Sequence, residues 1–188
     1  MAMLDNTSVK ISDVSVTSNA PFFANKAMSG KYQKRYTGIQ FFELEFTANY
    51  QMNDMSVVKK FVAEHQYGQP FSFPLSWFSE YQGTANGTLQ SGITAQPGAR
   101  LLTLGTFTGT LEAGTVIKFA NHSKLYTVQK DVQSGGQCSL FPSLRATVQA
   151  GEIINYRSPQ GTFVMTNDKI EWSINSLNKM KFTATEYI

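Results

Sequence analysis

The chain has 188 residues, of which 41% are apolar and 13% aromatic, so it can fill one large or two small hydrophobic cores. Charged residues make up only 15%, below the roughly 25% of an average soluble domain, and the net charge is only +3. This composition excludes a disordered chain and gives no broad basic footprint for nucleic acid.

The first forty residues contain a weak strand signal followed by a polar stretch. Apolar and polar residues alternate loosely over 6–17, which predicts one strand, or two with a break near Ser12 and Asp13. We interpret residues 18–38 as a long loop, of the kind that is functional or orders against a partner. This stretch holds the chain's one basic cluster, which we interpret as a solvated patch. Its members are Lys26, Lys31, Lys34 and Arg35.

The clearest strand signal lies at 38–50. Apolar side chains at Phe42, Leu44, Phe46 and Ala48 alternate with polar ones, which predicts a half-buried antiparallel strand. Glu43 and Glu45 then share the opposite face, about 7 Å apart. An acid/base pair is one interpretation, but we favour a solvated or interface-facing pair.

A short helix is predicted next, at 54–66. Asn53 or Asp54 can cap it, and Gly68 followed by Pro70 closes it. Its apolar stripe consists of Val58, Phe61, Val62 and His65. At the helix C-terminus we expect His65 to be structural, since its charge there complements the helix dipole.

The aromatic run at 71–78 predicts a short edge strand that ends near Pro74, because proline removes a backbone donor from the ladder. The alternative is an exposed patch for a partner. Glycine-containing linkers near 83–87 and 158–161 bracket a series of short strand signals at 88–91, 100–104, 115–120, 125–128, 137–141 and 152–156. Strands of this number predict a five- or six-stranded barrel of the OB or SH3-like kind.

Further strand signals at 162–166, 169–174 and 180–187 follow the second linker. This closing segment is too short for a core of its own, so it is expected to return to the first sheet. We therefore predict a mainly β fold with one short helix: an antiparallel β-sandwich domain from residues 1–82 and 162–188, with a small barrel inserted at 83–161.

Signatures of catalysis are missing from the sequence. It contains no phosphate loop, dinucleotide fingerprint or nucleophile elbow, and two histidines with one cysteine form no recognisable zinc set. Cys138 with His122 is the one conceivable nucleophile–base pair, but a buried inert thiol is expected at mid-strand. We predict no enzyme, no cofactor, no metal and no catalytic residues. The N-terminus has no signal-peptide pattern and no apolar run spans a bilayer, so a soluble protein made in a cytoplasm is expected.

Two runs in the predicted barrel carry a family resemblance. They are Asn-His-Ser-Lys-Leu-Tyr-Thr-Val at 121–128 and Pro-Ser-Leu-Arg at 142–145. They resemble the Gly-His-x-Lys-x-Tyr-x-Val hairpin and Pro-x-Leu-Arg run of bacteriophage tail proteins, with Asn121 in place of the glycine. The strand at 41–50, the helix, the Gly-x-Pro-Phe-x-Phe-Pro-Leu run at 68–75 and the closing strands are similar to distal tail proteins of long-tailed phages.

The resemblance implies a virion structural protein at the tail tip. Such proteins form a homo-hexameric ring that joins the tail tube protein to baseplate hub proteins, with a β-ring around the channel and an inserted barrel outside it. DNA passing through the ring would be the only nucleic-acid contact. The helix at 54–66 and the loop at 21–38 are the segments that we expect to contact neighbouring subunits.

Two other functions stay open. A barrel that exposed Phe119, Tyr126 and Phe141 could stack the bases of single-stranded nucleic acid or the sugars of a host surface glycan, although core packing is expected for these residues. A tail tube or tube-completion protein is the other alternative, since adjacent tail components share this architecture.

Overall fold

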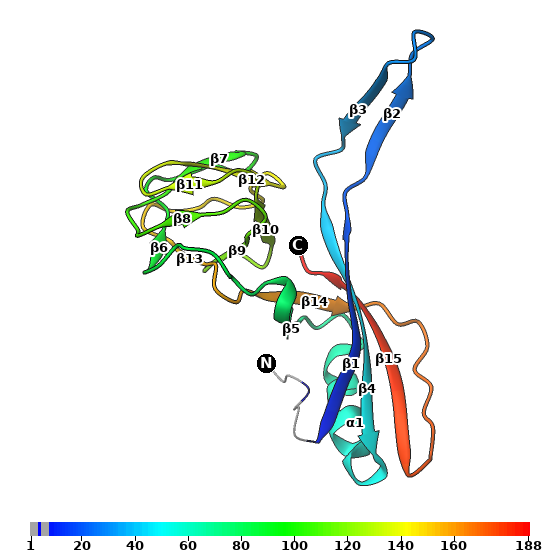
Figure 1. Cartoon of the computed structure of the whole chain (residues 1–188). Helices are drawn as coiled ribbons and strands as arrows, with labels where there is room; N and C mark the ends of the chain where they lie inside the picture. Colours follow the sequence, from blue (N-terminus) through cyan, green and yellow to red (C-terminus); the bar gives the residue numbers. More distant parts are fainter. Residues whose placement is uncertain (1–3, 5–7) are drawn as a thin grey trace. The chain divides into compact units, whose positions relative to one another are not determined.

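The computed structural model describes residue 4 and residues 8–188 (Figure 1). The chain folds into two compact units. The described residues of the sheet unit fall within Met1–Thr17, Phe42–Leu75 and Gln160–Tyr187, and the barrel unit contains Ser18–Phe41, Ser76–Pro159 and Ile188. Strands dominate both units and the paired strands are antiparallel, which confirms the mainly β prediction.

The sheet unit is built on one five-stranded sheet, ordered β1-β4-β15-β14-β5. Its strands are β1 (Val9–Asn19), β4 (Phe41–Gln51), β5 (Phe71–Pro74), β14 (Gln160–Met165) and β15 (Leu177–Glu186). The predicted strand at 38–50 is confirmed as β4, and β5 is the predicted edge strand ending at Pro74. β1 is a single strand, in which Asp13 adopts a φ of 52° at the predicted break.

One face of this sheet is apolar and carries the core of the unit. On β4 the buried residues are Phe42, Leu44, Phe46, Ala48 and Tyr50, as period-two alternation requires. The Phe46 ring lies 4.8 Å from Phe73 and 5.2 Å from Phe182, centroid to centroid. Aromatic rings from β4, β5 and β15 therefore meet in one layer.

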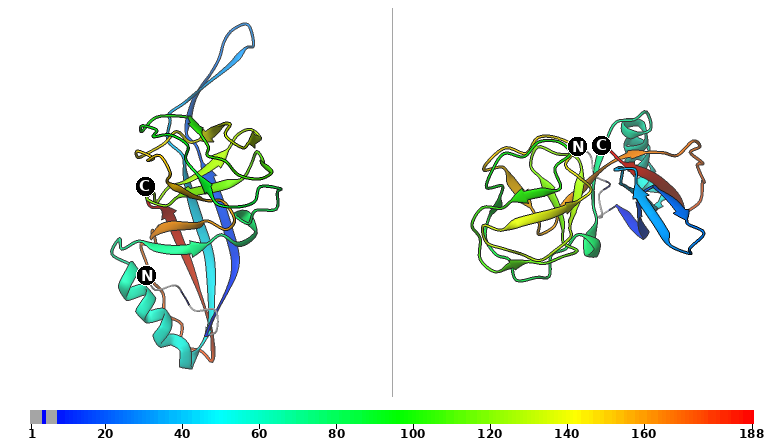
Figure 2. Two further views of the ribbon diagram at one scale, coloured as in Figure 1. Left: turned by 90° about the vertical axis from the view of Figure 1, so that its left-hand side faces the viewer. Right: turned by 90° about the horizontal axis from the view of Figure 1, so that it is seen from above.

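Helix α1 (Met55–His65) covers that apolar layer (Figure 2). Its buried residues are the predicted stripe of Val58, Phe61, Val62 and His65. The Phe61 ring packs 5.2 Å from Phe71 and 5.6 Å from Phe182. The helix begins one residue after Asp54, whose side chain makes no cap hydrogen bond. Among the described residues, no helix is long and apolar enough to cross a membrane.

The predicted strand at 169–174 is wrong. Residues 166–176 connect β14 to β15 without strand structure, and Ile174 is 74% exposed. Trp172 and Ile174 alternate with polar neighbours as in a strand, but no strand pairs with this segment among the described residues. The connection is held instead by contacts such as Lys59 Nζ, 5.8 Å from the centroid of the Trp172 ring.

The barrel unit contains a six-stranded sheet, ordered β6-β13-β9-β10-β12-β7. Its strands are β6 (Leu89–Gln90), β7 (Leu101–Thr103), β9 (Val116–Phe119), β10 (Leu125–Val128), β12 (Gln137–Phe141) and β13 (Ile153–Asn155). A bridge between Ser91 and Leu104 joins the two outer ends, and the Gly105 amide donates to Gln90 O at 2.8 Å. The sheet thus curls into a barrel that hides its edges (Figure 2).

A second, two-stranded ribbon of β8 (Thr110–Leu111) and β11 (Val132–Gln133) was not predicted, because two-residue strands leave no periodic signal. The barrel interior is filled by fully buried side chains that include Ile117, Phe119, Tyr126 and Leu140. Core packing of Phe119 and Tyr126 is therefore confirmed.

The loop predicted at 18–38 is wrong. β1 runs to Asn19, and β2 (Phe22–Lys26) pairs with β3 (Tyr32–Tyr36) in an antiparallel hairpin that we call the arm. Its turn contains Gly30 at a φ of 80°, a conformation that costs glycine little. The few apolar side chains among lysines and small residues concealed the strand alternation.

A hydrogen-bonded network around Tyr81 and Glu112 ties the start of the inserted segment to β8. The Tyr81 hydroxyl donates to the Glu112 carboxylate and lies 3.0 Å from Thr110 O, while the Thr84 amide donates to Glu112 Oε1 at 2.9 Å. The hydrogen bond from Tyr81 is the main factor that lowers the pKa of Glu112. Burial, followed by that hydrogen bond, raises the pKa of Tyr81 to about 12.

We expect Phe46→Ala to lower the free energy of unfolding by about 3–5 kcal/mol, because it removes a fully buried ring and leaves a cavity. Phe23→Ala is the matched control, since Phe23 is 71% exposed, and should change stability by less than about 0.5 kcal/mol. Urea denaturation measures both values, and equal effects would contradict the assigned core.

We expect Tyr81→Phe to reduce the acid sensitivity of folding. The pKa of Glu112 is lower in the folded state, so its contribution is present above its usual 4.5 and is lost as pH falls through the folded value. Without the Tyr81 hydroxyl that shift shrinks, and unfolding free energy should vary less between neutral and acidic pH. Urea titrations across this range measure the slope, with the exposed Tyr67→Phe as control; an unchanged slope in Tyr81→Phe would contradict the network's role.

Candidate interaction site

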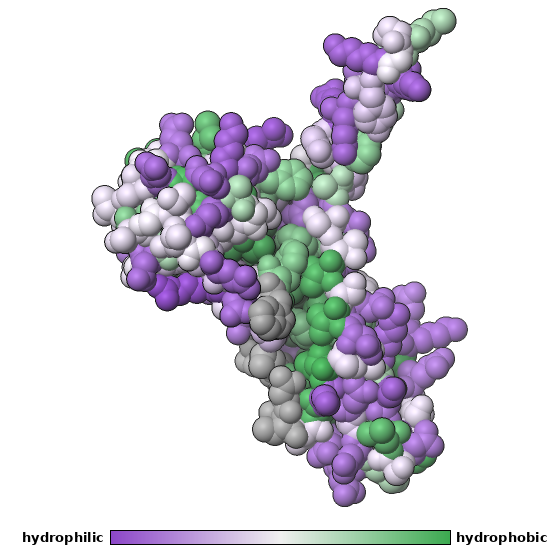
Figure 3. Space-filling model, in the orientation of Figure 1, coloured by the Kyte–Doolittle hydropathy of each residue, from purple (hydrophilic) through white to green (hydrophobic). Residues whose placement is uncertain are grey.

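The arm is exposed along its whole length. Every residue of β2 and β3 is solvent-accessible, and Phe23 and Met28 are 71% and 108% exposed. Its surface mixes hydrophilic and apolar patches, with apolar colour at the tip (Figure 3). An isolated two-stranded hairpin is marginally stable in water. The arm thus has no hydrophobic core of its own and offers a surface for a partner.

Directly paired residues of a hairpin share one face, so the register separates two faces of the arm. The first face carries Phe22, Ala24 and Lys26 from β2 and Tyr32, Lys34 and Tyr36 from β3. The second carries Phe23 and Asn25 opposite Arg35 and Gln33. Each face therefore combines aromatic rings with cations.

Cation–π contacts organise the first face. Lys34 Nζ lies 3.5 Å from the Phe22 ring centroid and 5.0 Å from that of Tyr36. The Phe22 and Tyr36 rings are 6.3 Å apart in an edge-to-face arrangement. Such contacts attract a cation to the ring electrons and hold the lysine against the aromatic surface.

Charge on this part of the chain has one sign. Lys26, Lys31, Lys34 and Arg35 all lie in the arm, and residues 14–42 contain no aspartate or glutamate. The four cations of the predicted basic cluster are exposed, as expected, but they lie on both faces and at the turn of a hairpin and not on a loop.

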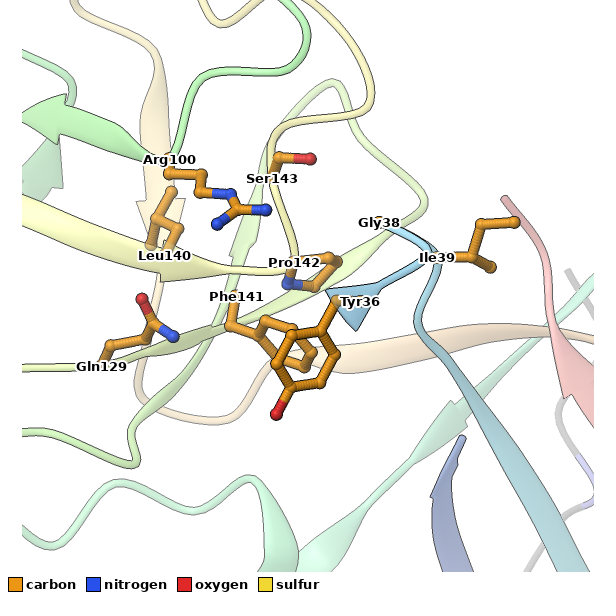
Figure 4. Close-up of a pocket in the computed structure, with 9 residues that line it drawn as sticks. All are labelled: Tyr36, Gly38, Ile39, Arg100, Gln129, Leu140, Phe141, Pro142 and Ser143. Atoms are coloured by element: carbon orange, nitrogen blue, oxygen red, sulfur yellow. The ribbon is translucent and has the colours of Figure 1, made fainter. Parts of the chain in front are cut away.

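A pocket of about 230 Å³ lies at the base of the arm (Figure 4). Its lining comprises Tyr36, Gly38, Ile39, Arg100, Gln129, Leu140, Phe141, Pro142 and Ser143. The Tyr36 and Phe141 rings lie 6.1 Å apart, centroid to centroid. The Arg100 side chain extends toward Pro142 and Ser143. This lining contains one cation and no carboxylate.

Gln129 presents a donor to the same pocket. Its Oε1 accepts a hydrogen bond from Ser139 Oγ at 2.8 Å, and its amide nitrogen is a donor. Together with the Arg100 guanidinium and the Ser143 hydroxyl, the site is rich in donors. The arrangement suits a ligand group in which an anion is attached to a small apolar stem.

The motifs that carried the family resemblance form a structural cluster beside this pocket. The Tyr126 hydroxyl contacts His122 Nδ1 and accepts from the Arg145 amide, each at 3.0 Å. Arg145 Nη2 donates to Gly38 O at 3.0 Å, and buried Lys124 Nζ donates to Gln40 Oε1 at 2.7 Å. These residues fasten the chain between arm and β4 to the barrel.

The conceivable pair of Cys138 and His122 is not assembled as a nucleophile and base. The nitrogens of His122 approach Tyr126 Oη and, at 3.4 Å, Thr147 O. Cys138 is fully buried, and burial raises the pKa of its thiol to about 12, so the thiolate is disfavoured. The expected burial of this thiol is confirmed.

The other candidates also have structural surroundings. His65 Nδ1 lies 3.1 Å from Gln69 O and its ring packs 4.8 Å from Phe61, in keeping with the structural role predicted for it. Glu43 and Glu45 lie on the face of β4 opposite the core, and Glu45 Oε1 pairs with Lys181 Nζ at 2.6 Å. Within the described residues, no group of three or more His, Cys, Asp or Glu side chains could hold a metal ion.

Sequence reasoning missed Tyr36, Arg100 and Gln129 as neighbours, since they lie on segments far apart in the chain. Of the three aromatic residues considered for stacking, Phe141 alone lines this pocket. No protein-family model matches the chain, and no curated protein sequence matches it.

Proposed function

We propose that this protein is a structural component of a bacteriophage tail tip, which assembles with copies of itself into a closed, hexameric ring joining the tail tube to the baseplate hub. The observation that carries the proposal is the open sheet of the sheet unit. Its outer strands are β1 and β5, and in the part of the chain that the structure describes no strand pairs with their outer edges.

The two edges differ in a way that favours head-to-tail assembly. β1 is 11 residues long, whereas β5 has four residues and ends in Pro74. Unpaired backbone groups along a long edge are a template for strand addition from another chain. When different surfaces of identical subunits join, the assembly closes into a ring if the rotation allows it.

The exposed face of the sheet is suited to a hydrated channel wall. Outward positions of β4 and β15 carry Glu43, Glu45, Thr47, Lys179, Lys181, Thr183 and Thr185. On these two strands the two glutamates balance the two lysines, so they add no excess of positive charge that would hold DNA phosphates. A wall of this kind lets DNA pass without binding it.

The arm adds a second contact surface of the kind that an assembly protein needs. Its strands are exposed, it has no core and it carries apolar rings on both faces. The barrel, by contrast, hides its edges by closure. Contacts with other copies of this chain are therefore expected at β1, with helix α1 as the further predicted contact, and the arm is expected to contact a neighbouring protein.

Light scattering over a range of concentrations, with electron microscopy of the same sample, tests the proposal. We expect closed rings with the mass of six chains. We expect Val14→Lys, on the exposed side of β1, to reduce the ring fraction at least about tenfold, because charge on an edge strand opposes strand addition. Ile174→Lys is the matched control, since Ile174 is exposed on the connection between β14 and β15.

Long tubes would instead indicate a tail tube protein. A monomer that binds single-stranded DNA in a salt-dependent manner would indicate the binding-module alternative. Equal loss of rings in both variants would contradict a role for the β1 edge.

A further inference from the structure

We infer that the arm and the pocket at its base form one continuous docking site for an acidic protein segment, whose carboxylate side chain enters the pocket and pairs with Arg100. The inference rests on the proposed function and names the chemistry of the neighbour that the arm would bind. That neighbour is a different protein and not a second copy of this chain.

Charge complementarity separates these two partners. The arm carries four of the 16 basic residues and none of the 13 acidic ones, so the remainder of the chain has 12 basic and 13 acidic residues. A nearly neutral remainder offers little excess negative charge to attract a +4 arm. A strongly acidic surface on another protein supplies that attraction and speeds association.

The aromatic residues favour protein over nucleic acid as the partner. Phe22, Tyr32 and Tyr36 lie on one face of the arm and Phe23 on the other, so apolar burial is needed on both faces. A protein cleft encloses both faces of a hairpin. Stacking of bases requires open rings, but Lys34 Nζ already lies over the Phe22 ring at 3.5 Å.

The pocket defines what part of the partner it takes. Its one cation, Arg100, matches the single charge and planar shape of a carboxylate. Gln129 and Ser143 add further polar side chains to the same lining. A volume of about 230 Å³ accommodates one side chain, with Leu140 and Pro142 against its apolar stem.

A ladder of rings joins the arm to the pocket. Phe22 lies 6.3 Å from Tyr36, which lies 6.1 Å from Phe141 in the pocket wall. Tyr36 thus belongs to both the first face of the arm and the pocket (Figure 4). A partner segment following this ladder would meet Lys34 first and Arg100 last.

Binding to a labelled peptide of alternating Glu and Tyr residues, measured by fluorescence anisotropy on the full chain, tests the inference. The matched peptide has Gln in place of Glu, and a thymidine oligonucleotide of equal length represents the phosphate alternative. We expect the Glu peptide to bind at least about tenfold more tightly than both at a physiological ionic strength of about 0.15 M. Hydrogen exchange should show protection over residues 22–36.

Charge variants locate the site. The test variant replaces the four cations of the arm, Lys26, Lys31, Lys34 and Arg35, by Glu, and should weaken peptide binding at least about tenfold. The control variant changes the net charge equally and should leave the affinity within about twofold. It replaces four exposed lysines outside the arm by Glu, namely Lys10, Lys130, Lys169 and Lys179. Arg100→Gln should weaken binding severalfold and Lys130→Gln should not. Near-UV circular dichroism checks that each variant is folded.

Equal weakening by both sets of reversals, or tighter binding of the oligonucleotide, would overturn the inference. So would loss of self-association in the arm reversal, since that would make a second copy the partner. Rings that form normally while the Glu peptide fails to bind would refute the inference and leave the proposed function intact. Peptide binding by a chain that forms no rings would refute the proposed function and leave the inference intact.

Discussion

The pairing of β4 with β15 is the constraint on which the sheet unit depends. Nine residues of β15, from Leu177 to Thr185, pair in register with β4, from Gln51 to Glu43. Because side chains alternate along a strand, this register places Phe46 and Phe182 side by side on the apolar face. A shift by one residue would turn the core side chains of either strand into solvent and leave helix α1 without a surface to cover.

Two other strand pairs of the same sheet explain how the chain tolerates two long excursions from it. The barrel segment leaves after β5 and returns at β14, and the two strands pair with Gln160 opposite Pro74. The arm likewise departs from β1 and returns at β4, its neighbour in the sheet. Since the ends of each excursion are held together by the sheet, the entropic cost of closing it rises only slowly with its length.

The two units differ in whether the edges of their sheets are paired, and the proposed assembly rests on this difference. The barrel joins β6 to β7 through the Ser91–Leu104 bridge and buries its aromatic residues. The sheet keeps β1 open, and the arm exposes rings and cations together. An open edge strand and exposed rings are the surfaces on which the proposed assembly depends.

Local pattern alone determined several elements of this protein. Alternation along 41–51 predicted β4 and its buried residues, and the spacing of Val58, Phe61, Val62 and His65 predicted the face of α1. The short strands of the six-stranded sheet of the barrel were predicted within a few residues, because turns and apolar alternation are encoded nearby in the chain, whereas β8 and β11 were not predicted. The burial expected of Cys138 followed from its mid-strand position.

The arm, the irregular connection at 166–176 and the pocket could be identified only from the tertiary structure. An exposed hairpin buries nothing, so it lacks the apolar alternation that marks a strand, whereas Trp172 and Ile174 alternate without any strand to pair with. Tyr36, Arg100 and Phe141 come from three separate segments. Their proximity depends on long-range hydrogen bonds such as that from Arg145 to Gly38, for which a single sequence holds no periodic signal.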